Sequence, residues 1–164
     1  MGLNMQNQLY IPPEIIIPQG AITMIFRDGK TDKIKEVYRV KNLITNLFKE
    51  AIADSIRGTT ANNRGIGTYH GLGTGTTAPA ISDTQLETEI FRKLISVRDV
   101  AANVATFQTF FTTSEGNATL REIGLFGDDA SGTANSGKLF ARVAVNRVKS
   151  SNDTLTLLHT VTIG

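Results

Sequence analysis

Apolar and polar residues alternate along the last stretch of the chain. One set of alternate positions carries Leu155, Leu157, His159, Val161 and Ile163, and the other carries Thr154, Thr156, Thr160 and Thr162, with Leu158 as the exception. A period of two is typical of an antiparallel strand with one buried face. The pattern therefore predicts a half-buried strand over 154–163. Short alternating runs separated by turn residues predict further strands over 93–98, 104–111, 118–126 and 139–148.

A β-hairpin is predicted near the start of the chain. Residues 21–26 and 33–40 are strand-like, and the Asp28-Gly29 pair between them is a frequent turn sequence. Basic side chains outnumber acidic ones from 27 to 41: Arg27, Lys30, Lys33, Lys35, Arg39 and Lys41 against Asp28, Asp32 and Glu36. We interpret these charges as a solvated strand face, with a contact patch for an acidic protein surface as the alternative.

The spacing changes to that of a helix after the hairpin. Apolar residues recur one, three or four positions apart, at Leu43, Ile44, Leu47, Phe48, Ala51, Ile52 and Ile56. Asn42 is the expected N-cap, and Gly58 fits the position just after the helix. The polar face mixes Lys49 with Glu50, whereas a helix that binds lipid usually carries rows of Lys and Arg. An amphipathic helix that packs on the core is therefore predicted over 42–56.

The glycine-rich segment that follows has two interpretations. Gly71, Gly73 and Gly75 allow positive φ and close backbone approach, and they favour a tight structural turn. A glycine loop before a helix can also bind phosphate, but the spacing of the known phosphate-binding motifs is missing. After Pro79, a short helix is expected over 83–90, where Ser82 and Gln85 have the spacing of a capping box.

These elements predict a mainly β protein: an antiparallel β-sandwich or barrel with one amphipathic helix and one short helix, plus an extended N-terminal arm. The expected division is an arm over residues 1–20 and a single β-rich domain over 21–164. A chain of 164 residues is long enough to bury one good core. Residues 127–137 are expected to form an exposed hairpin loop.

The first 20 residues combine prolines with large apolar side chains. Pro12, Pro13 and Pro18 favour extended backbone, and the apolar residues among them need a surface to cover. The segment is interpreted either as an edge strand of its own domain or as an arm that docks on a neighbouring subunit by strand addition or groove packing. The candidate docking residues are Leu9, Tyr10, Ile11, Ile15, Ile16 and Ile17.

Composition adds few candidates for chemistry. The net charge of +2 is too small to predict nucleic-acid binding, and no apolar run is long enough to span a membrane. The chain has no cysteine, so disulfides and thiol chemistry are excluded. No targeting signal is evident at the N-terminus, which favours synthesis and folding in the cytoplasm. We therefore expect no cofactor, no nucleic-acid partner and no membrane partner.

The titratable residues favour structural roles. His159 is expected to be a hydrogen-bonded core or interface residue, and neither it nor His70 has the spacing of a metal ligand. Asp128 and Asp129 are a weak candidate for a surface cation site. Charged pairs near the predicted short helix, among Glu87, Glu89, Arg92 and Lys93, are interpreted as surface ion pairs. The sequence places no nucleophile, base and orienting group together, so we predict that the protein is not an enzyme.

Several motifs resemble a family of small virion proteins of tailed bacteriophages. They are the glycine-rich run Gly71–Ala80, the Asp-Thr-x-Leu segment Asp83–Ile90, the Glu-Ile-Gly-Leu-Phe strand Glu122–Phe126, the Leu-x-Ala-Arg strand Leu139–Arg142, and the closing strand Asp153–Ile163. The resemblance extends from Lys41 to the end of the chain and does not include the N-terminal arm.

The resemblance implies a non-catalytic structural protein of the virion, assembled in the host cytoplasm. The implied partners are other copies of itself, as a closed trimer or a larger ring, and other virion structural proteins. Placement in the tail, collar or fibre attachment region is favoured, with a head decoration protein as the alternative. A receptor- or glycan-binding module is a further alternative, although the chain has no tryptophan and only three tyrosines.

Overall fold

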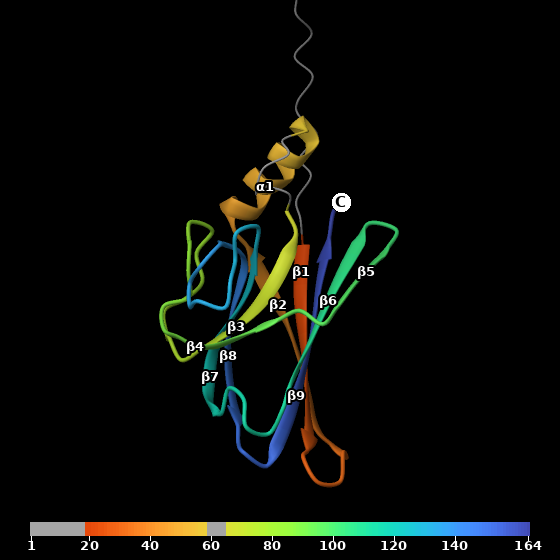
Figure 1. Ribbon diagram of the computed structural model, residues 1–164, viewed down its shortest axis with the longest axis vertical. Coiled ribbons are helices and arrows are strands. Elements are labelled where there is room, and N and C mark those ends of the chain that lie inside the picture. Colours follow the sequence, from red (N-terminus) through yellow and green to blue (C-terminus); the bar gives the residue numbers. More distant parts are fainter. Residues whose placement is uncertain (1–18, 59–64) are drawn as a thin grey trace, which may run out of the picture.

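The expected mainly β fold is confirmed in the computed structural model, which describes residues 19–58 and 65–164. Nine antiparallel strands form one curled sheet, a half-barrel, in the order β4-β3-β7-β8-β2-β1-β9-β6-β5, with one helix at its end (Figure 1). The strands are β1 (Gln19–Asp28), β2 (Ile34–Ile44), β3 (Gly67–Gly73), β4 (Glu89–Leu94), β5 (Val97–Ala101), β6 (Val104–Phe111), β7 (Ala118–Gly127), β8 (Lys138–Lys149) and β9 (Asp153–Thr162). The arm predicted over 1–20 overlaps β1, which already includes Gln19 and Gly20.

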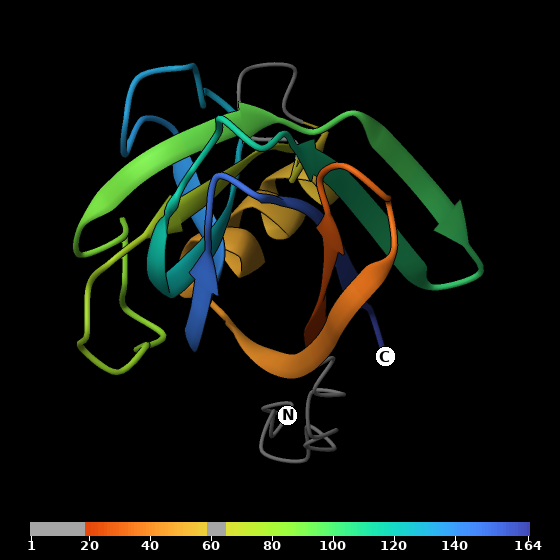
Figure 2. The same ribbon diagram turned by 90° about the horizontal axis from the view of Figure 1, so that it is seen from below.

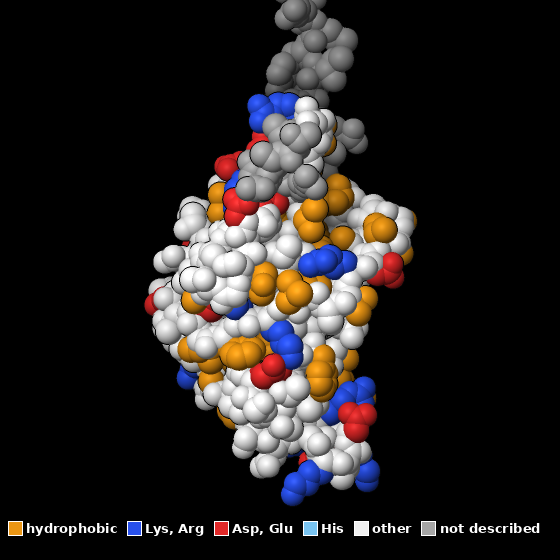
Figure 3. Space-filling model, viewed as in Figure 1, with side chains coloured by type: hydrophobic (Ala, Val, Ile, Leu, Met, Phe, Trp, Pro, Cys, Tyr) orange, Lys and Arg blue, Asp and Glu red, His pale blue; other side chains and the backbone are white. Residues whose placement is uncertain are grey.

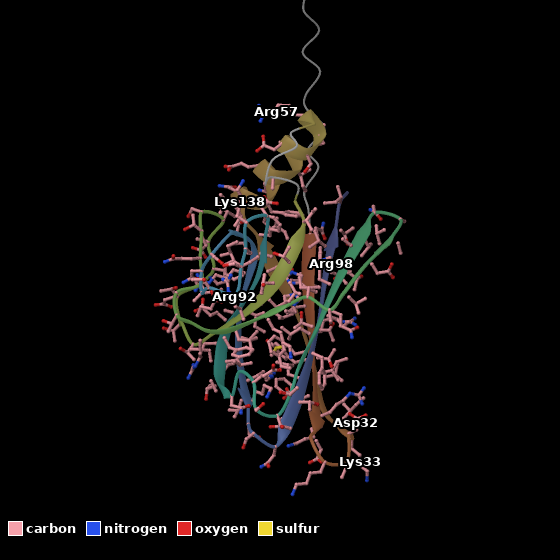
Figure 4. All side chains as sticks on the ribbon, viewed as in Figure 1. Asp32, Lys33, Arg57, Arg92, Arg98 and Lys138 are labelled. Carbon is pink, nitrogen blue, oxygen red and sulfur yellow. The ribbon has the colours of Figure 1, made fainter. Side chains whose placement is uncertain are left out.

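The two edges of the sheet are consecutive in the chain, and this explains the curl. β4 and β5 stand at opposite ends of the strand order, yet only Ile95 and Ser96 separate them. The Ile95 N–H donates to Thr68 O of β3, and the Ser96 N–H donates to Gln108 O of β6, both at 2.9 Å. The chain therefore passes from one edge of the sheet to the other, and Figure 2 shows this stretch arching over the interior. Arg98, labelled in Figure 4, donates to Gly67 O at 2.8 Å and adds a link across this passage.

A second seam lies between β2 and β8. These strands pair only at Leu43 with Arg142 and at Ile44 with Ala141. Away from that pairing, Arg147 bridges the seam: its Nε lies 2.7 Å from Glu36 Oε1, and its guanidinium stacks 3.8 Å above the Tyr38 ring. The seam divides the sheet into a half made of β4, β3, β7 and β8, which we call the loop half, and a half made of β2, β1, β9, β6 and β5, which we call the outer half.

The core lies inside the curl and draws on both halves. One cluster contains Ile22, Met24, Phe26, Phe111, Leu155 and Leu157 from the outer half and Leu72, Leu120, Ile123, Val143 and Val145 from the loop half. A second cluster lies under the helix and includes Phe48, Ala51, Phe107, Leu125, Phe140 and Val161. Burying each large side chain of this kind stabilises the fold by about 1.5 to 3 kcal/mol. Because both halves of the sheet contribute such side chains, their burial favours the curled form of the sheet.

The helix α1 (Asn46–Arg57) begins later than the sequence predicts. Asn42 was the expected N-cap, but it lies in β2, and Thr45 takes the capping position. The reason is the β2–β8 pairing, which extends β2 through Ile44. The end is as predicted: Gly58 adopts φ 82°, the left-handed conformation that favours glycine. Figure 4 labels Arg57 near this tip and Asp32 and Lys33 at the β1–β2 turn, at the opposite end of the molecule.

The segment from 69 to 91 contains the main errors of the sequence prediction. The short helix expected over 83–90 is absent: residues 74–88 form an irregular loop and β4 begins at Glu89. Gly71 and Gly73 lie within β3 rather than in a tight turn, and their φ values are not positive. The prediction that these glycines allow other atoms to approach the backbone closely is correct at Gly71, where a Cβ would lie 2.8 Å from the Phe126 ring.

The other predicted strands are found with small changes at their ends. β6 has the predicted bounds, the hairpin of β1 and β2 is present, and β7, β8 and β9 match within about two residues. The strand predicted over 93–98 is divided between β4 and β5 because the chain changes partner strand at Ile95.

Candidate interaction surface

A groove of about 530 Å³ lies where β1, β2 and β9 meet the start of α1. Its lining residues are Gln19, Gly20, Ala21, Lys41, Asn42, Leu43, Ile44, Lys49, Ile81, Thr160 and Thr162. One wall comes from the 74–88 loop, whose Ile81 is held in place by a hydrogen bond of 2.9 Å from Asn46 N–H to Ile81 O. Ile81 is half exposed, and with Ala21 and Leu43 it gives the groove an apolar floor.

The groove opens onto an uncharged strip of the outer half. On the face of the sheet away from the core, β1 presents Ala21, Thr23 and Ile25, and β9 presents Thr156, Leu158, Thr160 and Thr162. One cross-strand row runs from Val37 through Ile25 and Thr156 to Phe110, and Val37 and Phe110 are exposed. The usual outward face of an antiparallel sheet is polar, so an uncharged strip across its central strands is a candidate contact surface.

Basic side chains flank the groove and strip on one side. Arg39, Lys41 and Lys49 are exposed there. Arg39 Nε donates to Thr23 Oγ1 at 3.1 Å, and no carboxylate of the described ranges 19–58 and 65–164 lies within ion-pair distance of Lys41 or Lys49. Most of the charges predicted as a solvated strand face are therefore exposed, although Arg27 and Asp28 are half-buried. Lys41, which is one of them, and Lys49 stand at the rim of the groove.

Asn42 is the unusual polar residue of the groove. Its side-chain amide packs against the Cα of Gly20, where a Cβ would overlap it. Its Oδ1 and Nδ2 atoms are buried and have no hydrogen-bond partner among the described residues. A buried amide that lacks partners costs roughly 1 to 3 kcal/mol, so these two atoms mark Asn42 as a place where a further polar group would bind favourably.

The opposite face of the molecule looks different. Along β4 and β5, the exposed apolar side chains are Ile90, Leu94, Val97 and Val100. Figure 3 shows hydrophobic side chains on this face scattered among charged ones. Scattered exposed apolar residues are normal for a soluble protein, and this face is the weaker candidate for a contact surface.

A buried ionic network organises the loop half. Glu122 on β7 accepts hydrogen bonds from the backbone N–H groups of Gly75, Glu87 and Thr88 at 2.7 to 3.0 Å, and from Arg142 Nε at 2.9 Å. Arg142 on β8 also donates to Asp83 Oδ2 at 2.7 Å. Burial lowers the pKa of Arg142, but its bonds to Asp83 and Glu122 outweigh burial and raise that pKa overall. The irregular 74–88 loop is therefore held to the sheet by the Glu122 carboxylate and the Arg142 guanidinium.

Glu89 and Arg92 form a second buried pair, not a surface pair as the sequence suggested. Their side chains are 1% and 3% exposed, and Arg92 Nη2 donates to Glu89 Oε2 at 2.8 Å. Arg92 also donates to Ser131 O and Ser136 O and lies 4.4 Å from the Phe126 ring centroid. The pair thus ties β4 to the loop between β7 and β8, and Figure 4 labels Arg92 there.

Glu87 also has a structural role. It accepts hydrogen bonds from the backbone N–H and the hydroxyl of Thr77, at 2.8 and 3.0 Å. These bonds, the backbone one first, lower the pKa of the Glu87 carboxyl.

Lys149 is a buried cation at the other end of the sheet. Its Nζ donates to Thr112 O, Asn117 Oδ1 and Asp153 O at 2.7 to 3.0 Å. Burial lowers the pKa of its ammonium group. Because Thr112 follows β6 and Asp153 begins β9, this residue joins the loop half to the outer half.

The two histidines stack on each other in the core. His70 on β3 and His159 on β9 have ring centroids 5.6 Å apart and are nearly parallel, and His70 Nδ1 is hydrogen-bonded to Thr109 Oγ1 at 2.8 Å. Burial lowers the pKa of His159 to about 4, and burial together with His159 holds the pKa of His70 well below 6.5. The predicted core position of His159 is confirmed, but neither of its ring nitrogens has a hydrogen-bond partner in the described ranges.

The remaining sequence candidates fall into two groups. Asp128 accepts a hydrogen bond from Gly65 N–H and lies 3.8 Å from Lys138 Nζ, whereas Asp129 is exposed. Within 19–58 and 65–164, no group of three His, Asp or Glu side chains is arranged to hold a metal ion. The candidate docking residues Leu9, Tyr10, Ile11, Ile15, Ile16 and Ile17 lie outside the described residues.

The groove itself was not predicted from the sequence. The signal that could have found it is the lack of charge at the outward positions of β1 and β9. Ile81 gave no such signal, because its place beside Leu43 depends on the fold of the 74–88 loop.

Comparisons of the chain with known proteins identify no relative. No family model, no curated protein and no solved structure matches the chain. Among the described residues, no helix is both long enough and apolar enough to cross a membrane.

Proposed function

We propose that this chain is a non-catalytic structural protein of a tailed-bacteriophage virion, which self-associates and docks through its N-terminal arm. The favoured place is the tail, collar or fibre attachment region, and the alternative is a head decoration protein. Its partners would be further copies of itself, in a trimer or ring, and other virion proteins. It would fold in the host cytoplasm and end in the virion.

The observation that carries self-association is the uncharged strip with its groove. Ala21, Ile25 and Leu158 occupy outward positions in the middle of the sheet, where solvated strands usually carry polar side chains. A second protein surface would bury these side chains, with a gain of about 25 cal/mol for each Å² of apolar surface. This arrangement supports a protein that works by contact with other chains.

The motifs that resemble the phage family meet in one place. Thr77 and Asp83 lie in the glycine-rich and Asp-Thr segments, Glu122 begins the Glu-Ile-Gly-Leu-Phe motif, and Arg142 ends the Leu-x-Ala-Arg motif. Arg142 is hydrogen-bonded to all three of the other residues. The residues on which the resemblance rests therefore contact one another and have a structural role. This supports an architecture shared with the phage family more than a shared reaction.

The buried charges of this scaffold have structural partners. Glu122 receives four hydrogen bonds and Glu89 is paired with Arg92. A general base must instead present a free lone pair to a substrate proton. The roles of these two carboxylates thus support a structural assignment.

Labelling of phage particles tests the proposal. Antibody raised against the chain would be applied with gold to purified particles produced from the genome that encodes it, with particles lacking the gene as the control. Gold at the tail or collar supports the favoured placement, and gold over the capsid supports the decoration alternative. Particles in which neither labelling nor mass spectrometry detects the chain would contradict the proposal.

A further inference from the structure

We infer that the groove between β1, β2, β9 and α1 binds residues Ile15–Ile17 of a second copy of this chain. The inference rests on the proposed function insofar as that function requires self-association. It assigns a specific site and a specific occupant, which neither the motifs nor the proposed placement in a virion supplies.

Charge and polarity favour this occupant. The groove has an apolar floor of Ala21, Leu43 and Ile81 and a rim with Lys41 and Lys49. Residues 1–18 carry one charged side chain, Glu14, and it directly precedes the Ile15–Ile17 run. An extended segment that places its isoleucines on the floor brings Glu14 toward the lysines at the rim. The pairing is thus complementary in both apolar and ionic groups.

The position of the groove favours a second copy over the chain's own arm. Gln19 both begins β1 and lines the groove, so the arm leaves β1 at the groove's edge. To enter its own groove, the chain would have to reverse direction between Gln19 and Ile17. The residue between them is Pro18, which disfavours the helical conformation at Ile17 and favours extended backbone there. The tightest hairpin needs two turn residues, so one residue is too few for Ile17 to fold back along β1 as a paired strand.

The result is a directional contact. Each copy gives an arm and receives one, and the two surfaces involved are different. Such a head-to-tail interface closes into a ring when the rotation between copies is a whole-number fraction of a full turn without translation along the axis, and it gives an open filament otherwise. A trimer or larger ring is one closed form that this single repeated contact can build.

Cross-linking of full-length chains tests the occupant directly, because the natural chain has no cysteine. Ile16→Cys and Ile81→Cys chains, tagged to differ in size, would be mixed and oxidised mildly. We expect a mixed disulfide-linked pair, with far less when Val148→Cys replaces Ile81→Cys; Val148 is exposed and does not line the groove. Equal yields with the two partners would overturn the inference. A chain that carries both Ile16→Cys and Ile81→Cys gives a further control. If it forms mainly an intrachain disulfide at every concentration, the arm docks on its own chain and the inference is overturned.

Assembly measurements provide a second test. By analytical ultracentrifugation, Ile16→Asp should raise the concentration at half-assembly about ten- to a hundredfold, as expected from losing one buried isoleucine. Glu14→Lys should weaken assembly, and Lys49→Glu in the same chain should restore it. Thermal melts of all variants should match the natural chain, which separates docking from folding. A natural chain that stays monomeric at all concentrations would refute the inference, whereas particle labelling would still decide the proposed function.

Discussion

The two halves of the curled sheet place their charges in opposite ways. In the loop half, Glu89, Arg92, Glu122 and Arg142 are buried and bind one another and the adjacent loops. In the outer half, the outward positions of β1 and β9 are uncharged from Ala21 to Ile25 and from Thr156 to Thr162. One half thus gains order from internal ion pairs, while the other leaves apolar side chains partly exposed on its outward face. Mutations in the first should change folding, and mutations in the second should change assembly.

The largest expected effect is at Glu122. Glu122→Ala takes from the buried Arg142 one of its two carboxylate partners and frees three backbone N–H groups, and removal of one member of a buried ion pair typically costs about 3 to 5 kcal/mol. Urea unfolding of the purified variant measures this loss. The double variant Glu122→Ala with Arg142→Met should lose less than the two single variants added together. A loss below about 1 kcal/mol for Glu122→Ala would show that the network does not hold the loop half together.

Acid should weaken the contact between the halves through the histidine pair. The pKa of His159 is lowered from 6.5 to about 4, so between these pH values the unfolded chain binds the proton and the folded chain does not. The stabilisation is complete above pH 6.5 and is lost as the pH falls toward 4, by about 3 kcal/mol for His159 alone. His70, whose pKa is also lowered, adds to the loss.

Urea unfolding at pH 7, 5.5 and 4.5 checks this prediction. In His159→Leu the slope of stability against pH should be smaller over the same range, because only one of the two histidines, His70, remains to contribute. The same slope in the variant and the natural chain would contradict the account of the histidine pair.

Lys149→Met should have an intermediate effect. The variant keeps the length of the side chain but removes the buried donor shared by three acceptors, at Thr112, Asn117 and Asp153. The expected loss is about 1 to 3 kcal/mol, and it should appear as faster amide exchange at the ends of both β6 and β9. Faster exchange at only one of them would show that Lys149 does not join the halves.

The smallest effect on stability, and the largest on assembly, is expected in the outer strip. Thr156→Lys puts a charge between Ile25 and Phe110 on a surface position, where substitutions usually change stability by less than about 0.5 kcal/mol. Its melting curve should match the natural chain while its assembly is lost. Val148→Lys, an exposed position on the loop half, is the matched control and should assemble normally. If the two variants assemble equally well, the strip is not part of the interface.

The outer half was the more predictable part of the fold. Its strands follow the alternating pattern, and in β6 the buried residues Phe107, Thr109 and Phe111 alternate with less buried ones. The hairpin of β1 and β2 was predicted from the Asp28-Gly29 turn. The local pattern is sufficient here because most strands of the outer half pair with a strand that is next to them in the chain: β1 pairs with β2, and β5 pairs with β6.

The loop half was less predictable because its order comes from distant residues. The 83–90 segment has a helix-like cap and apolar spacing, but Glu122 and Arg142 take up the polar groups of this segment and hold it as an irregular loop. Gly73 and Gly75 looked like turn residues, yet they leave room for the Glu122 side chain. No local pattern signals a partner that lies 35 to 59 residues away in the chain. The groove was missed for the same reason, since its walls come from separate segments.

The most direct test of the central claim, that the chain is a virion component held by its arm, is its copy number in purified particles with and without residues 1–18. Quantitative mass spectrometry would compare particles grown with the full chain and with the truncated chain, after circular dichroism has shown that the truncated protein folds. We predict that the full chain is present at a fixed number of copies per particle, and that the folded, truncated chain is absent. Equal incorporation of both chains, or absence of both, would contradict the account.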